Sequence, residues 1–434
     1  MRERRGFLFI NYYFSPSPAV GALRNSKFAK YVALGGDEVT VLTTSNVRLN
    51  PGSDIIGRAV PGLTIALMPT FDYQTVKFLV SRRAGSRPVR NLGRGRRRLL
   101  DLLEIFPLSV ILGEGGLIYA VGVFFKAFFL AAAGRCRAVY TSYSPFTDLY
   151  CGYLLKLIFP SLVWVADLRD YPLRDGMPGW IVRWNSFFYR RILGKADRLT
   201  AVSEGLAGYL SRFHDHPRVL RNAFDPDDIV SFPEDSGGTD RFTLVYAGSL
   251  YDGRRNPTLL FKALASCFDD STLDRKLVRF CYAGRDGGLF ASLAETEGVA
   301  DIVEDAGLVG RDAALRLQSR ASVLVMLTWV SGMEKGVLSS KFYEYLAWGK
   351  PVICLVNGGR DPEIEQIFSE TSAGLVANGE DAASVSLLRR YLRDRYAEFR
   401  EKKPILSRAD EQTRNRHSYP VVAAQLAALL AGRD

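Results

Sequence analysis

Histidine and cysteine, the side chains that build most metal sites and nucleophilic triads, are scarce in this chain. Its 434 residues include three histidines and five cysteines. The cysteines stand singly, at positions 136, 151, 267, 281 and 354, with neither a C-x-x-C pair nor a neighbouring histidine. This scarcity argues against a zinc ribbon, a disulfide framework or a histidine-based catalytic triad, and we expect a reducing, cytoplasmic setting.

Long apolar runs are also few. The run that follows the charged N-terminus ends at Asn11 and is too short for a signal-peptide core. The exception is Gly115 to Ala133, which is apolar except for Lys126 and approaches the ~20 residues that a membrane span needs. Because Glu114 and Lys126 would both be costly in lipid, we expect a buried helix, or one lying at a membrane interface, rather than a span.

Acidic residues are outnumbered by basic ones. Lys and Arg total 57 against 46 Asp and Glu, a formal charge of +11, and arginines outnumber lysines 44 to 13. Guanidinium groups bind phosphates and carboxylates through paired hydrogen bonds. The composition therefore predicts an anionic partner, which could be nucleic acid, an acidic membrane surface or a phosphorylated small molecule. Arg82 to Arg98 holds eight of the arginines, either as a solvated loop or as a basic loop on anionic lipid.

The chain is long enough for two or three domains at about 150 residues each. Short apolar strands alternate with helical patterns from Phe7–Ile10 to Leu199–Val202, and the alternation restarts at Phe242–Ala247. This order is typical of parallel sheets with helices on both faces. We predict an α/β fold with two Rossmann-like domains, divided into 1–230 (with an insertion at about 80–133), a linker at 231–240, a second domain at 241–408, and a closing helix within 409–434.

One predicted helix carries a strong candidate site. It runs from Ser340 to Trp348, because serines open helices well, Gly349 suits a left-handed C-terminal position and Pro351 blocks continuation. Its N-terminus, with unpaired N–H groups and Lys341 beside them, is suited to a diphosphate. Glu344 lies one turn later and could accept both hydroxyls of a ribose. Capping serines and a surface glutamate would explain the same spacing equally well.

Two further loops of the second half could hold an anion. Arg254 and Arg255 stand between a strand that ends at Gly248 and a helix that Pro257 opens, at the edge where α/β sheets bind ligands. The loop Gly284–Gly288 also joins a strand to a helix, but it lacks the G-x-G-x-x-G spacing and is a weak signal alone.

The first half offers a charged cluster after a strand. Asp167, Arg169 and Asp170 stand where the sheet is expected to end, and they could serve a ligand or form a salt-bridged turn without function. Asp225-Pro-Asp227 matches the metal-binding D-x-D of some sugar transferases. It lacks strand context, so we interpret it as structural.

Six motifs follow one another in a recognisable order. They are Gly21-Ala-Leu-Arg24, Asp167-Leu-Arg-Asp170, Val202-Ser-Glu-Gly-Leu206, Asn222-Ala-Phe-Asp225, Tyr246-Ala-Gly-Ser249 and Lys341-Phe-Tyr-Glu-Tyr-Leu-Ala-Trp-Gly-Lys-Pro351. Together they resemble the family 4 glycosyltransferases of the GT-B type, over nearly the whole chain. The resemblance implies two Rossmann-like domains whose parallel sheets face each other across a cleft, and a retaining transferase. It also implies that the C-terminal helix within 409–434 crosses back to the N-terminal domain.

The resemblance also implies roles for individual residues. Arg254, Arg255 and Lys341 would be catalytic, since they would neutralise the departing diphosphate. The donor nucleotide sugar would be bound by Gly21, Arg24, Gly248, Ser249, Gly284, Arg285, Gly307, Leu308, Val309, Ser339, Ser340 and Glu344. The acceptor side would be formed by Asp167, Arg169 and Asp170.

One position departs from the family pattern. The family often has a second glutamate eight residues before Glu344, where this chain has Gly336. The resulting Gly-Val-Leu-x-Ser-Lys form is similar to that of a branch that acts on lipid-linked acceptors.

The expected function follows from the resemblance. We expect transfer of a sugar from a nucleotide diphosphate sugar, with UDP as the first expectation, to a polyprenyl-phosphate-linked or other membrane-associated glycan in cell-surface polysaccharide biosynthesis. No metal or other cofactor would be required, and the enzyme would be cytoplasmic, on the inner face of the cell membrane at an anionic surface. The alternative is a catalytically silent protein of the same fold that binds nucleotide and membrane. A nucleic-acid binder is disfavoured because no known module for it is present, and an epimerase because histidine is scarce.

Overall fold

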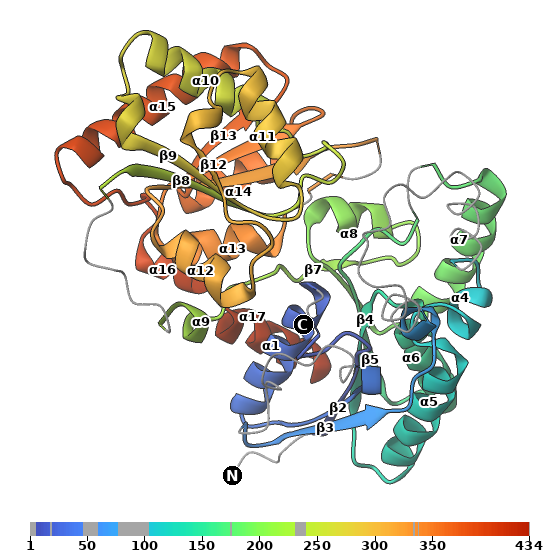
Figure 1. The fold of residues 1–434 in the computed structure, drawn as a ribbon. Helices are drawn as coiled ribbons and strands as arrows, with labels where there is room; N and C mark the ends of the chain where they lie inside the picture. The colour runs from blue at the N-terminus through green and yellow to red at the C-terminus, as the bar shows by residue number, and fades with distance from the viewer. Residues whose placement is uncertain are drawn as a thin grey trace. The chain divides into compact units, whose positions relative to one another are not determined.

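The computed structural model describes residues 6–17, 20–46, 60–76, 104–173, 176–230, 240–332, 335–336 and 338–433. The chain forms two compact units. The first combines the residues up to Arg221 with the segment that begins at Tyr419, and the second is Asn222–Ser418. Each unit is a parallel sheet flanked by helices (Figure 1). The arginine-rich segment predicted at 82–98 lies outside the described residues.

The described part of the first unit contains one sheet of seven strands in the order β3-β2-β1-β4-β5-β6-β7. The strands are β1 (Gly6–Ile10), β2 (Glu38–Thr44), β3 (Leu63–Met68), β4 (Ala138–Tyr143), β5 (Val163–Leu168), β6 (Arg198–Ala201) and β7 (Arg218–Val219). The helices are α1 (Val20–Leu34), α4 (Leu108–Ile111), α5 (Gly116–Ala132), α6 (Phe146–Ile158), α7 (Gly179–Leu193), α8 (Glu204–Leu210) and α17 (Tyr419–Leu430).

The described part of the second unit contains a six-stranded sheet in the order β10-β9-β8-β11-β12-β13. Its strands are β8 (Phe242–Ala247), β9 (Val278–Ala283), β10 (Val303–Asp305), β11 (Val323–Trp329), β12 (Val352–Asn357) and β13 (Gly374–Asn378). Its helices are α9 (Pro226–Val230), α10 (Thr258–Asp269), α11 (Gly287–Thr296), α12 (Arg311–Ser319), α13 (Ser340–Ala347), α14 (Pro362–Thr371), α15 (Ala383–Arg400) and α16 (Glu411–Arg416).

The central strands are apolar because helices cover both faces of each sheet. Every residue of β8 and β12 is buried, and β1 is buried from Phe7 to Ile10. In β1, Phe7 pairs with Val39 on one side and with Ala138 on the other, both in parallel. Continuous apolar runs of this kind are what a parallel sheet buried on both faces requires.

Most of the predicted elements are confirmed, and the differences have local causes. The strand β3 was not predicted. It lies at the edge of the sheet, where its side chains are mostly half-buried, and its sequence lacks the continuous buried apolar run of the central strands. The predicted helix at 340–348 ends one residue earlier, with Gly349 in the left-handed conformation (φ 63°) as expected. The segment 222–230, expected in the first domain, belongs to the second unit, where the Phe224 N–H donates to the His417 carbonyl.

The most apolar segment of the sequence forms α5. One face of this helix is buried and includes Tyr119, Val123 and Ala127. The other face exposes Phe125 and Phe129 along with three further apolar side chains. Among the described residues, no helix is both long and apolar enough to traverse a bilayer. The helix therefore packs on the first unit with one face, and the described residues of that unit leave its other face exposed.

Candidate functional site

Three glycine-bearing loops meet at the carboxyl edge of the second sheet. Gly248, Gly284 and Gly307 lie just beyond β8, β9 and β10, which are neighbours in the sheet. The Gly248 N–H donates to the Ala283 carbonyl at 2.8 Å, and the Gly284 N–H donates to the Gly307 carbonyl at 2.8 Å. A Cβ at Gly284 would lie 2.3 Å from the Gly248 carbonyl oxygen, so this contact requires glycine. The loops predicted to border a nucleotide thus form one continuous rim.

Asp286 fixes the rim. One of its carboxylate oxygens accepts both from the Ser249 hydroxyl and from the Leu250 N–H, each at 2.7 Å. Tyr246 donates from its hydroxyl to the Ser249 carbonyl at 2.7 Å. The hydroxyl of Ser249, predicted to contact the donor, is therefore already engaged within its own loop.

The structure separates the two arginines predicted to be catalytic. Arg255 is buried, with its guanidinium carbon 4.4 Å from the Tyr251 ring centroid and 5.1 Å from that of Trp329. Its Nε has no hydrogen-bond partner among the described residues. Arg254 is exposed and lies 6.0 Å from the Trp329 ring. A buried guanidinium with an unpartnered N–H fits a site for an anion that comes from outside the protein.

Lys341 joins Arg255 at this rim. It stands at the second position of α13, and its ammonium would lie 2.8 Å from a Cβ placed at Gly248. Burial, together with the neighbouring Arg255 charge, lowers the pKa of Lys341 to about 8. Two cations held this close favour an anion between or beside them, since an anion would relieve both the desolvation and the repulsion.

Glu344 lies one turn further along α13 and is not free. Its carboxylate accepts from Arg311 at 2.8 Å, and the same guanidinium donates to Asp228 at 2.8 Å. The two carboxylates raise the pKa of Arg311 against the opposing effect of burial. Sequence reasoning missed Arg311 and Asp228. The only available signal was that Arg311 opens a helix directly after the Gly307–Val309 loop.

The remaining predicted donor residues lie around this rim. Arg285 and Leu308 are exposed, Leu308 by 79%, while Val309 is half-buried. Ser339 occupies the N-cap position of α13, but its side chain makes no capping hydrogen bond, and Ser340 is the first helical residue. Both serines thus stand beside Lys341 at the helix N-terminus.

Gly336 has a conformational reason to be glycine. Its backbone has a φ of 67°, in the left-handed region that side chains with a Cβ disfavour. Its N–H donates at 2.7 Å to the buried carboxylate of Asp361. Asp361 also accepts from the N–H groups of Glu363 and Ile364 and so caps α14. Where the resemblance led us to expect a second glutamate, this chain has a glycine whose N–H is bound by Asp361.

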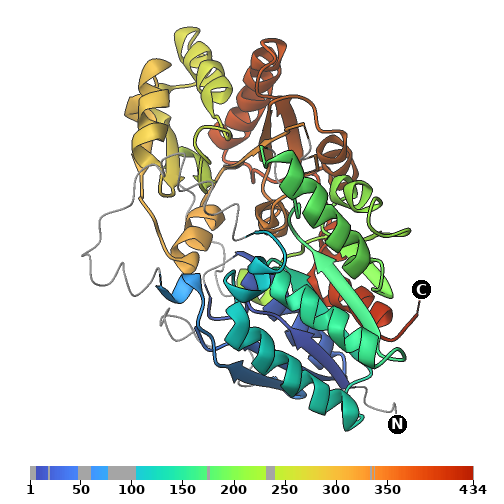
Figure 2. The ribbon, with the colours of Figure 1, turned by 90° about the vertical axis from the view of Figure 1, so that its right-hand side faces the viewer.

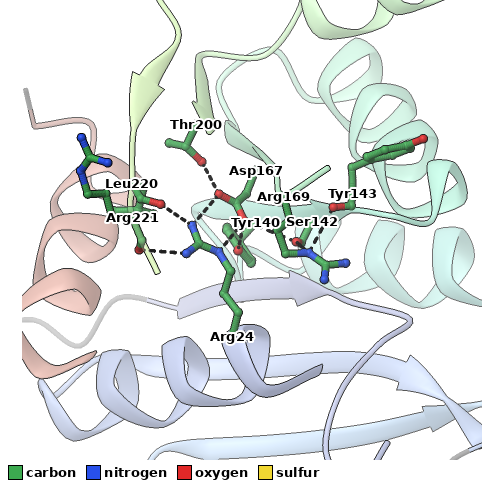
Figure 3. A network of polar contacts seen from close by, with 9 residues as sticks. All are labelled: Arg24, Tyr140, Ser142, Tyr143, Asp167, Arg169, Thr200, Leu220 and Arg221. Carbon is green, nitrogen blue, oxygen red and sulfur yellow. Dashed lines mark hydrogen bonds and ion pairs between the residues drawn. The ribbon is translucent and has the colours of Figure 1, made fainter. Parts of the chain in front are cut away.

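In the first unit, Arg24 and Asp167 form a buried ion pair (Figure 3). Arg24 donates to both Asp167 oxygens and to the carbonyls of Leu220 and Arg221. Asp167 also accepts from Thr200 and, through its other oxygen, from Tyr140. Burial alone would raise the pKa of Asp167, but the Arg24 charge outweighs it and the pKa is lowered. From the resemblance, Arg24 was predicted to contact the donor and Asp167 the acceptor. In the structure both side chains are buried and bonded to each other and to neighbouring protein groups.

Arg169, unlike Arg24, extends to Gly21 at the carboxyl edge of the first sheet. Its Nε donates to the Ser142 hydroxyl and its Nη2 to the Ser144 carbonyl. A Cβ at Gly21 would lie 1.5 Å from Arg169 Nη1, so the guanidinium rests on the glycine at the start of α1. Asp170 is exposed. The structure thus brings Gly21 and Arg169 together at the carboxyl edge of the first sheet.

Glu114 is a further polar group at this edge that the sequence did not reveal as part of a site. One of its oxygens accepts from Tyr13 at 2.6 Å, Tyr73 at 3.2 Å and Gln74 at 3.1 Å, and the other accepts from Ser144 at 3.0 Å. These donors come from the ends of β1, β3 and β4, which only the folded sheet brings together. Glu114 therefore ties three strand-end loops to the start of α5.

The predicted α/β fold with two parallel sheets is confirmed, and it is similar to the fold of solved glycosyltransferase structures. The chain is similar to the sucrose-phosphate synthase of Thermosynechococcus elongatus (TM-score 0.60, 15% identity, 99% of each chain covered). It is also similar to WaaG, a glycosyltransferase involved in lipopolysaccharide biosynthesis (0.56, 15%, 98% of this chain and 100% of that one). A third similar structure is a UDP-forming trehalose-phosphate synthase of Burkholderia xenovorans in complex with glucose-6-phosphate (0.57, 12%, 99% and 100%). No protein-family model and no curated sequence matches the chain.

The lowered pKa of Lys341 predicts a pH dependence of anion binding. With its pKa lowered to about 8, the ammonium loses its charge as the pH rises through that range, so the affinity for a nucleoside diphosphate should fall between pH 7 and about 9.5. Calorimetric titrations across this range measure the effect. Lys341→Arg, whose charge persists throughout, should bind with little pH dependence. An equal fall in both proteins would assign the effect to another group.

The Arg24 and Asp167 pair predicts a large effect on folding. Arg24→Met leaves a buried carboxylate uncompensated and should lower the free energy of unfolding at neutral pH by about 3–5 kcal/mol. Because the pKa of Asp167 is lowered in the folded state, the stability that the pair contributes is present above the unfolded pKa and is lost as the pH falls. Urea denaturation measures it, and Asp167→Asn added to Arg24→Met should restore much of the loss. A single variant as stable as the wild type would contradict the assignment.

Proposed function

We propose that this protein is a retaining glycosyltransferase that uses a nucleotide diphosphate sugar, UDP-linked as the first expectation, and a membrane-associated glycan acceptor. The second unit would hold the donor and the first unit the acceptor. The observation that carries the proposal is a pair of cations: Lys341, which lies beside Gly248 at the N-terminus of α13 and one turn before Glu344, and the buried Arg255, whose charge acts on Lys341. This arrangement offers two cations and free helix N–H groups to a diphosphate, and a carboxylate to a ribose.

The same arrangement suits the chemistry of sugar transfer. Cleavage of the bond between sugar and phosphate passes through an oxocarbenium-like state, with negative charge growing on the departing diphosphate. Arg255 is held in place by two aromatic rings, and Lys341 is fixed on a helix, so neither must reorganise as that charge develops. A fixed donor of this kind contributes about 3 kcal/mol to transition-state stabilisation. The acceptor oxygen would attack from the face that the diphosphate leaves, with retention of configuration.

Arg311 would hold Glu344 ready for the nucleoside. Its contact uses one carboxylate oxygen of Glu344, and the ribose hydroxyls would be received at the other or in exchange for the arginine. Gly284, Arg285 and Gly307–Val309 would then border the base, since they form the rim on that side of Gly248.

The first unit supports an acceptor with its own charge. Arg169 carries its cation on Gly21 at the carboxyl edge of the first sheet, where ligands of α/β sheets bind. A phosphate of a polyprenyl-phosphate-linked glycan fits this group. The acceptor would be met at the inner face of the cell membrane, with the exposed apolar face of α5 toward anionic lipid.

The donor assignment predicts selective ligand binding. Thermal unfolding scans with UDP-, GDP-, dTDP- and CMP-sugars should single out one nucleotide, since a ligand at 100 times its dissociation constant stabilises by about 2.7 kcal/mol. Glu344→Ala should abolish that shift, because the ribose loses its carboxylate. A shift unchanged in Glu344→Ala would refute the ribose role. Binding without any turnover of the nucleotide sugar, even slow hydrolysis, would indicate the catalytically silent alternative.

The burial difference between the two arginines predicts unequal kinetic effects. Arg255→Met keeps the apolar stem between Tyr251 and Trp329 but removes the charge, and should lower kcat by about 10²–10³ with a smaller change in KM. Arg254→Met, on the exposed neighbour, is the matched control and should lower kcat by less than threefold. Steady-state rates of nucleotide release measure both. Equal effects of the two variants, or an effect of Arg255→Met on KM alone, would contradict a leaving-group role for Arg255.

A further inference from the structure

The helix α7 turns aromatic side chains outward. Trp180, Trp184 and Phe187 are spaced by four and three residues, so they share one face, and they are exposed by 60%, 48% and 61%. The opposite face, with Ile181 and Tyr189 among its members, is buried against the first unit. Large aromatic side chains gathered on the solvent side of a helix are unusual for a monomeric soluble protein.

The cations of α7 lie beside these aromatic residues. Arg183, Arg190 and Arg191 are exposed, and α7 contains no Asp or Glu. None of the three arginines forms an ion pair with a described residue. Basic residues without acidic partners, interleaved with Trp and Phe, are typical of helices that lie in the headgroup region of an anionic bilayer.

The apolar face of α7 continues onto two other helices. The Trp184 indole N–H donates to the Phe106 carbonyl at 2.7 Å, and the Phe106 ring lies 4.3 Å from that of Phe188. The chain then enters α4 and α5, which contain no carboxylate and one cation, Lys126. Their exposed apolar residues are Leu108, Ile111, Leu117, Ile118, Val121, Phe125 and Phe129. Figure 2, in which this side faces the viewer, shows α5 and α7 in one helical layer with α6, which packs against both.

We propose that this surface, the outer faces of α4, α5 and α7, docks the protein on an anionic phospholipid bilayer, with Trp180 and Phe187 entering the headgroup region. The choice of lipid over a protein partner rests on charge, because the surface is apolar and basic with no carboxylate in its three helices. This inference deepens the proposed function, since it rests on an acceptor carried by the membrane.

The first turn of α7, at one end of this surface, lies near the carboxyl edge of the first sheet. A helix that follows a parallel strand begins near the carboxyl edge of the sheet, and α7 follows β5 and the Arg169 loop. Trp180 stands in the first turn of α7. A bilayer that receives this turn would therefore present lipid-linked groups near Arg169.

Vesicle binding by the full-length protein tests the proposal. Wild type should co-sediment with vesicles of phosphatidylcholine and phosphatidylglycerol in equal parts, and much less with phosphatidylcholine alone. Trp180→Ser/Phe187→Ser should weaken binding at least tenfold. Arg183→Gln/Arg190→Gln should weaken it about 30-fold, at roughly 1 kcal/mol for each cation near anionic lipid. The matched controls, Leu289→Ser/Leu406→Ser and Arg400→Gln, alter exposed residues of the second unit and should bind like wild type.

The tryptophans give a second measurement that needs no variant to fold. Two of the five tryptophans, Trp180 and Trp184, belong to the docking face, so emission should shift to shorter wavelength on addition of the anionic vesicles. No binding by wild type, or equal binding by face and control variants, would overturn the proposal. A dimer in solution that Trp180→Ser/Phe187→Ser converts to a monomer, without vesicle binding, would also overturn it and make the face an interface between copies.

The outcomes separate this inference from the proposed function. Vesicle binding that depends on the α7 face, in a protein that turns over no nucleotide sugar, would support the docking surface while refuting the transferase. Turnover of a nucleotide sugar with no affinity for vesicles would refute the docking surface alone.

Discussion

The candidate site depends on two positive charges kept together where water is largely excluded. The Lys341 ammonium lies at Gly248, the Arg255 guanidinium reaches the neighbouring Ser249 carbonyl, and burial together with the Arg255 charge lowers the pKa of Lys341. This arrangement costs free energy through desolvation and repulsion. The surrounding structure offsets this cost locally. The Tyr251 and Trp329 rings lie close to the Arg255 guanidinium, and the absence of a Cβ at Gly248 leaves room for the lysine ammonium. The N-terminus of α13 is itself positive and adds to the preference for an anion. An anion bound beside these two cations would lower that free-energy cost.

The sequence was sufficient to predict the two parallel sheets and the helix that carries Lys341 and Glu344. Continuous apolar strands indicate sheets buried on both faces, and Gly349 and Pro351 mark the end of the helix. It was not sufficient to rank Arg254 against Arg255, because adjacent residues in a turn differ only in which one the turn directs inward. Nor could it reveal Arg311 or Glu114, whose partners come from distant segments and are assembled by the sheet.

The arginines of this chain differ in burial and in the groups that they contact. Arg24 is buried in an ion pair with Asp167 and also donates directly to the Leu220 carbonyl. Arg311 binds the carboxylate of Glu344. Arg255 is buried, and its Nε has no partner among the described residues. The arginines on the outer face of α7 have no protein partner among the described residues. A single composition figure therefore sums groups with unrelated physical roles, and only burial and partners distinguish them.

The left-handed backbone at Gly336 limits how this site could be rebuilt. A glutamate introduced there would have to adopt a conformation that side chains disfavour, or pull its N–H away from Asp361 and loosen the cap of α14. The single substitution Gly336→Glu would therefore not give a well-folded site with glutamates at both 336 and 344. Reaching it would require a coordinated change of the loop and of the helix that Asp361 caps, so the residue type at position 336 is tied to the stability of α14.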